Sequence, residues 1–142
     1  MEYKTTAHSV YWLKYHVVWV CKYRRRVLNP GVCAYFKRML PKLLRSMPGV
    51  EVETIGFDGD HLHMVMEIPP KYSIANVMGG LKSQSASELR RAFKWLSKVY
   101  WKENIVWSPG YFASSVGVDE ETIKHYVEHQ GRQDSGQLRL QL

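Results

Sequence analysis

The sequence predicts a single α+β domain in which helices cover one face of an antiparallel sheet. Its 142 residues suffice for one domain with its own core. Hydrophobic residues make up 45% and charged residues 23% of the chain, as is typical of a folded globular domain. Strand-like and helix-like patterns follow in the order strand, helix, strand, strand, helix, strand, which is that of a ferredoxin-like (RRM-like) unit. We expect this domain over residues 1–132 and a short flexible tail over 133–142.

The first strand and the first helix are predicted by residue type and spacing. Residues 9–23 are dense in aromatic and β-branched side chains and contain no Gly or Pro, which predicts one long strand. Asn29 then supplies a helix cap, and Pro30 suits a first helical position. Apolar residues follow at helical spacing, so we expect a helix that ends near 47–49.

The middle of the chain predicts a hairpin and a second helix. Residues 50–57 and 61–68 read as strands, because the intervening residues 58–60 (DGD) form a strong turn sequence. Ser73 can cap a helix whose apolar positions keep the 3.6-residue period as far as Leu96.

The last third of the chain predicts a broken strand and a final helix. Residues 105–107 and 111–116 resemble one strand interrupted by 108–110 (SPG). Asp119 should cap the last helix, and Gly131 is a natural place for it to stop. Because the ferredoxin-like unit needs only two helices, this helix is left over and one face of the sheet remains open.

The charge of the chain favours a polyanionic partner, although plain solubility explains a basic protein equally well. The net charge is +7 and the sequence pI is about 9.5. Basic residues cluster directly after the first strand, close to aromatic residues that could stack on bases. The candidate nucleic-acid contacts are Lys22, Tyr23, Arg24, Arg25 and Arg26, with Arg90 and Arg91 of the second helix as an extension.

Nothing in the sequence indicates a membrane or a secreted protein. The two cysteines, Cys21 and Cys33, have no metal-like spacing, and no signal peptide is recognisable. The longest apolar run falls far short of the roughly 20 residues that cross a bilayer. We therefore expect a cytoplasmic protein.

A pair of histidines is the strongest indication of a site. His61 and His63 alternate with apolar residues in the third strand, so both should project from the open face, where two imidazoles can converge on one metal ion. With 6 histidines in 142 residues, such a pair also arises by chance. Its position directly after a tight turn favours the metal site.

The final helix adds two further candidates. Tyr126 and Gln130 lie four residues apart and therefore share one helical face. Taken singly, Tyr126 could be a core aromatic and Gln130 a solvated amide. His125 and His129 have the same spacing, but no strand residue is implied as a third ligand for them.

Several motifs together resemble one known family. They are residues 13–20 (LKYHVVWV), 22–26 (KYRRR), 60–63 (DHLH), 69–73 (PPKYS), 81–82 (LK), 107–112 (WSPGYF) and 126–130 (YVEHQ). In this order they resemble the single-tyrosine HUH transposases of bacterial and archaeal insertion sequences of the two-hundred/six-hundred-five type, often called TnpA. The resemblance covers nearly the whole chain. One departure is Gly59, where the family favours proline, and it affects only the turn.

The resemblance implies a fold, a chemistry and partners. The fold is that of an HUH endonuclease with a C-terminal catalytic helix. His61, His63 and Gln130 would hold Mg²⁺ or Mn²⁺, and Tyr126 would attack DNA to give a 5′-phosphotyrosine and a free 3′-OH. The implied substrate is single-stranded DNA with hairpin ends, not a small molecule. The resemblance also implies a homodimer in which the final helix is exchanged through residues 114–117.

Two other classes of function fit part of the sequence. A non-catalytic RNA- or DNA-binding module would explain the sheet and the aromatic residues but not Tyr126 and Gln130. A hydrolytic metal-dependent phosphodiesterase would use water as the nucleophile and would leave Tyr126 a structural role. The two catalytic classes differ in whether DNA becomes attached to the protein.

Overall fold

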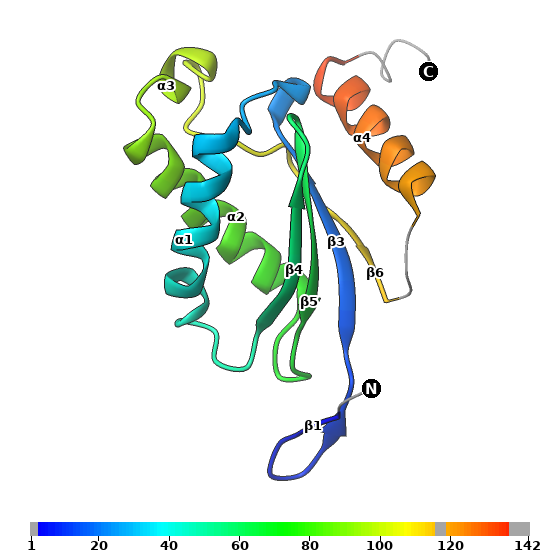
Figure 1. Ribbon diagram of the computed structural model, residues 1–142. Coiled ribbons are helices and arrows are strands. Elements are labelled where there is room, and N and C mark those ends of the chain that lie inside the picture. Colours follow the sequence, from blue (N-terminus) through cyan, green and yellow to red (C-terminus); the bar gives the residue numbers. More distant parts are fainter. Residues whose placement is uncertain (1–2, 116–118, 137–142) are drawn as a thin grey trace.

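The computed structural model describes residues 3–115 and 119–136, and a four-stranded antiparallel sheet lies at its centre (Figure 1). The strand order is β4-β5-β3-β6. The strands of this sheet are β3 (Lys14–Val20), β4 (Glu51–Phe57), β5 (His61–Glu67) and β6 (Phe112–Ser114). The helices are α1 (Pro30–Leu44), α2 (Ile74–Ala92), α3 (Leu96–Val99) and α4 (Glu120–Asp134), with a 3-10 turn η1 (Lys22–Arg24). A separate two-stranded sheet pairs β1 (Lys4–Thr5) with β2 (Val10–Tyr11).

The two faces of the sheet are covered by different helices. Figure 1 shows α1 and α2 on one side of the sheet and α4 on the other. The larger core lies under α1 and α2, where Trp19 packs edge-on against Phe36 with ring centroids 6.2 Å apart. On the other face, Val127 of α4 packs against Val18 and Val20 of β3. The expected extra helix therefore covers part of the face predicted to be open.

The predicted helix caps are confirmed. The side chains of Asn29, Ser73 and Asp119 each accept a hydrogen bond from a backbone N–H three residues later, at 2.9, 3.0 and 2.9 Å. Each satisfies a backbone donor that has no partner within its helix. Residues 51–57 and 61–67 pair as the predicted hairpin.

Two predicted elements are shorter than expected. The long first strand is divided, because only Lys14–Val20 pairs with β5 and residues 22–24 turn away as η1. In that turn Tyr23 and Arg24 have φ angles of 59° and 53°, which no strand can accommodate. The second helix ends at Ala92, because Phe93 leaves the helical conformation with ψ at 87°.

Three further boundaries differ near the C-terminus. Residues 105–107 form no strand, and Trp107 makes only an isolated bridge to Cys21. Gly131 does not end the last helix, which continues to Asp134 because its backbone remains helical and hydrogen-bonded. The predicted tail therefore begins inside α4. Residues 116–118, which include half of the expected flexible segment, and residues 137–142 lie outside the described part of the chain.

None of the helices in the described ranges is both long enough and apolar enough to cross a membrane.

Candidate metal centre and tyrosine helix

The structure brings the two predicted histidines together on the α4 side of the sheet. His61 and His63 stand at the start of β5, on the face opposite Leu62 and Met64, whose side chains are in the main core. The centroids of the two imidazole rings are 6.5 Å apart. This alternation places both rings on the same surface, as the sequence predicts.

Asp60 fixes the orientation of His61. The Nδ1 atom of His61 donates to Oδ1 of Asp60 at 2.9 Å, and Nε of Arg24 donates to Oδ2 of Asp60 at 3.2 Å. The hydrogen bond from His61 and that from Arg24 hold the pKa of Asp60 below its usual range, although burial acts to raise it. An ionised Asp60 keeps the proton on Nδ1, so Nε2 of His61 presents a lone pair to a metal ion.

His63 lies over the backbone of Gly56 in the neighbouring strand. The two residues are paired in register, and a Cβ atom at position 56 would lie 2.5 Å from both Cε1 and Nε2 of His63. Only glycine leaves room for the ring in this position. Burial and the nearby His61 lower the pKa of His63, which favours the neutral imidazole that metals bind.

Tyr126 and Gln130 share one face of α4, but it is not the face next to the histidines. One hollow of about 600 Å³ is lined by His61 and His63 together with Val127 of α4. A separate hollow of about 620 Å³ is lined by Tyr126 and Gln130. Within this one chain, the two histidines therefore open into a different hollow from the candidate nucleophile, and the third predicted metal ligand, Gln130, lies in the hollow of Tyr126.

Tyr126 is not activated in its present position. Burial, and to a lesser extent the negative charge of Asp134, raise its pKa to about 12. Its ring packs against Phe112 with centroids 5.6 Å apart. At neutral pH the phenol is therefore protonated and a weak nucleophile without help from a cation or a base.

A group of polar residues holds the C-terminal end of α4 against η1 and Ser108. Asp134, whose side chain is 2% exposed, accepts hydrogen bonds from Oγ of Ser108 at 2.6 Å and from the backbone N–H of Tyr23 at 3.0 Å. Nζ of Lys22 lies 3.6 Å from the same carboxylate. Nε2 of Gln130 donates to Oγ of Ser108 at 2.7 Å. These residues form what we call the latch.

The predicted DNA contacts fall into two groups. Three of them have roles inside the fold: Lys22 belongs to the latch, Arg24 binds Asp60, and Arg90 donates to the carbonyl of Ile105 at 3.0 Å. The other four, Tyr23, Arg25, Arg26 and Arg91, are exposed, and Arg24 is exposed as well, although it pairs with Asp60. Two of the four are paired on the surface, Arg26 with Asp58 at 3.6 Å and Arg91 with Glu88 at 3.1 Å.

Sequence reasoning missed several residues that shape these sites. The sequence places Asp60 in a turn and in the motif of residues 60–63 but gives it no role of its own, although a carboxylate beside a metal-binding histidine is a common orienting group. Gly56 lies inside a strand, where a glycine often marks a site at which another group comes close to the backbone. The sequence predicts that Gly131 ends the last helix, whereas in the structure a Cβ there would lie 2.0 Å from Cδ of Arg24. No sequence pattern points to Asp134, because its hydrogen-bond partners Ser108 and Tyr23 are 26 and 111 residues away.

Comparison with known proteins identifies relatives over almost the full chain. The family model described as Transposase IS200 like matches residues 9–130. The transposase for insertion sequence element IS200 of Salmonella typhimurium LT2 is 33% identical over 134 residues, which is 92% of this chain and 85% of the relative. The ISDra2 transposase TnpA of Deinococcus radiodurans is 31% identical over 131 residues, 92% of each chain.

Solved structures show the same fold. A crystal structure from Deinococcus radiodurans R1, assigned as a transposase, matches with a TM-score of 0.77 and 30% identity over 89% of this chain and 97% of the other. A REP-associated tyrosine transposase bound to a REP hairpin matches with a TM-score of 0.52 and 14% identity, over 87% of this chain and 69% of the other. At 14% identity, the similarity to the second structure shows only a shared fold. The family model and the two sequence relatives together show that the chain belongs to the IS200-like transposase family.

Proposed function

We propose that this transposase cleaves and rejoins single-stranded DNA at hairpin-bearing element ends through a 5′-phosphotyrosine on Tyr126. The observation that carries the proposal is the pair of imidazoles of His61 and His63, the first oriented by Asp60, on the face of the sheet that α4 with Tyr126 also covers. In the cleavage step the Tyr126 oxygen bonds to the scissile phosphorus, the bond from phosphorus to the 3′ oxygen breaks, and a 3′-OH is released. The reverse attack by another 3′-OH rejoins DNA without an external energy source.

The histidine pair fits a divalent metal ion, Mg²⁺ or Mn²⁺. His61 offers Nε2 because Asp60 holds its Nδ1 proton, and the lowered pKa of His63 favours its neutral form. Within residues 3–115 and 119–136, no three His, Cys, Asp or Glu side chains gather to hold a metal. The amide oxygen of Gln130 would supply the third ligand. When bound, the cation withdraws charge from the scissile phosphate.

The active unit we propose is a homodimer with composite sites. Tyr126 and Gln130 open into one hollow, and His61 and His63 into another, so one subunit offers two incomplete halves. In a two-fold dimer, the Tyr126 hollow of each subunit can meet the histidine hollow of its partner, and the symmetry produces two complete sites. Tyr126 would then work with His61 and His63 of the partner subunit.

Covalent trapping tests the chemistry. The protein is incubated with a labelled single strand that carries the element end and with Mn²⁺, and adducts are separated on a denaturing gel. We expect an adduct with the wild type and none with Tyr126→Phe, which still binds the DNA. Cleavage by Tyr126→Phe would contradict the nucleophile assignment. Cleavage by the wild type without an adduct would support hydrolysis by water.

Mixed dimers test the shared site separately. A Tyr126→Phe subunit and a His61→Ala, His63→Ala subunit are co-expressed with different tags, and the heterodimer is isolated. A composite arrangement gives this heterodimer one site with an intact tyrosine and an intact histidine pair, so cleavage returns. If each site forms within one subunit, the verified heterodimer stays inactive, and the dimer proposal fails while the chemistry stands.

A further inference from the structure

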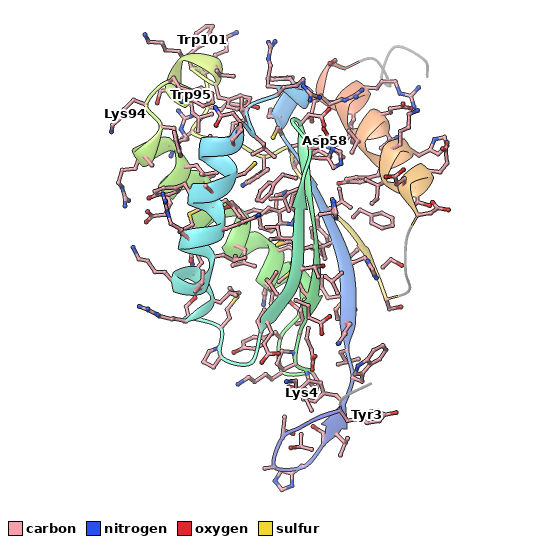
Figure 2. All side chains as sticks on the ribbon, in the orientation of Figure 1. Tyr3, Lys4, Asp58, Lys94, Trp95 and Trp101 are labelled. Carbon is pink, nitrogen blue, oxygen red and sulfur yellow. The ribbon has the colours of Figure 1, made fainter. Side chains whose placement is uncertain are left out.

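Two tryptophans are exposed at the end of the molecule formed by α3. Trp101 is 73% exposed and Trp95 is 37% exposed. Figure 2 shows both beside α3, at the same end of the molecule as Asp58 and far from Tyr3 and Lys4. We call the two rings, with the surrounding Arg25, Arg26, Lys98 and Lys102, the tryptophan surface.

We propose that the tryptophan surface binds single-stranded DNA by stacking unpaired bases on Trp101. The inference rests on the proposed action on single strands, but it concerns a different part of the molecule from the histidines and Tyr126. In this proposal the ring of Trp101 stacks on a base, and the surrounding cations bind the phosphates. Base stacking on exposed aromatics, next to a basic track, is the common way in which proteins hold single strands.

The charge around Trp101 favours a polyanion. Two hollows of about 230 and 510 Å³ adjoin the ring, and Glu103 is the one acidic residue among the described residues that line them. Nζ of Lys102 lies 5.0 Å from the centroid of the Trp101 ring. Within the described ranges, Arg25, Lys98 and Lys102 form no ion pair, so their charges remain available to phosphates.

The backbone next to Trp101 is anchored although its ring is largely exposed. The preceding residue, Tyr100, is buried, and its hydroxyl donates to the carbonyl of Lys22 at 2.9 Å. Trp101 therefore contributes little to the core while its position relative to η1 is fixed. A large aromatic ring that is exposed to water on an anchored backbone is suited to a ligand with a flat face.

The tryptophan surface is continuous with the histidine site. Arg26 lines both the larger hollow beside Trp101 and the hollow that contains His61 and His63. Tyr23 of η1 is 45% exposed and lines the smaller hollow beside Trp101. A single strand held at Trp101 can thus pass over Arg26 toward the metal-binding candidates.

The test measures binding without cleavage. Full-length protein in EDTA is titrated against a fluorescein-labelled oligothymidylate of roughly 20 nucleotides and against an abasic strand of the same length, by fluorescence anisotropy. Trp101→Ala is compared with Trp101→Phe, which keeps a ring. Trp12→Ala is the matched control, because Trp12 is 37% exposed and also has a lysine, Lys14, over its ring at 5.3 Å.

We expect Trp101→Ala to weaken binding of the oligothymidylate by about 5- to 150-fold and to leave binding of the abasic strand unchanged. Trp101→Phe should retain most of the affinity, and Trp12→Ala all of it. Unchanged affinity of Trp101→Ala, or equal losses on both strands, would overturn the proposal. The covalent adduct on Tyr126 is scored separately, so a failure of the cleavage chemistry is distinguishable from a failure of this binding site.

Discussion

Replacing Asp134 by alanine should release the C-terminal end of α4 from the sheet. The change removes the acceptor of three hydrogen bonds, from Ser108 at 2.6 Å, from the backbone of Tyr23 at 3.0 Å and from Gln130 at 3.5 Å. It also leaves Lys22, whose side chain is only 15% exposed, without its carboxylate. The apolar contact of Val127 with β3 is untouched.

The size of the effect follows from those contacts. A hydrogen bond to a charged group contributes about 1.5–3 kcal/mol, and the loss of one partner of a buried pair can cost more. Because Lys22 keeps some access to water, we expect a loss of about 2–4 kcal/mol in docking free energy. The population of undocked helix should therefore rise about 30- to 700-fold.

Hydrogen exchange of the α4 amides measures this population. In Asp134→Ala the protection of the amides in the last two turns of α4 should fall about 30- to 700-fold. The protection of amides in β3 and β5 should stay constant. Glu121→Ala is the control, because Glu121 forms an exposed pair with His125 on the same helix, at 3.2 Å, and should change protection within about threefold. Equal protection in Asp134→Ala and wild type would refute the latch.

Three further predictions concern the metal and the DNA. His61→Ala should abolish adduct formation, with partial recovery at high Mn²⁺ by mass action; full activity at low metal would contradict the assignment. Gly56→Ala, whose Cβ would lie 2.5 Å from the His63 ring, should weaken Mn²⁺ binding about 10- to 100-fold in a metal titration, whereas Gly79→Ala, with nothing within 4 Å, should not. Arg25→Gln with Arg26→Gln should reduce the slope of log affinity for single-stranded DNA against log salt by about 1.4, and an unchanged slope would place the DNA elsewhere.

Local sequence patterns were sufficient for most of the fold. Asn29, Ser73 and Asp119 each act through a backbone N–H three residues away, so the helix starts could be predicted from the sequence. The alternation that places His61 and His63 together is equally local. The end of the first strand was missed, because η1 depends on contacts with Asp60 and Asp134 far along the chain.

The relation between the tyrosine and the histidines could not be predicted from spacing. Tyr126 and Gln130 do share a helical face, as four-residue spacing requires, but the rotation of α4 on the sheet decides which hollow that face lines. Val127 sets this rotation by packing on Val18 and Val20. The rotation of α4 on the sheet depends on packing between elements, which no single segment encodes.

The η1 turn contacts three parts of the molecule at once. Arg24 binds Asp60, which orients His61; the Tyr23 N–H binds Asp134 of α4; and the Lys22 carbonyl receives the hydroxyl of Tyr100, beside Trp101. Its two residues with positive φ are held in a costly conformation by these bonds. Thermodynamic linkage makes any resulting coupling reciprocal: if DNA at Trp101 stiffens this turn and so tightens metal binding, bound metal must tighten DNA binding by the same factor.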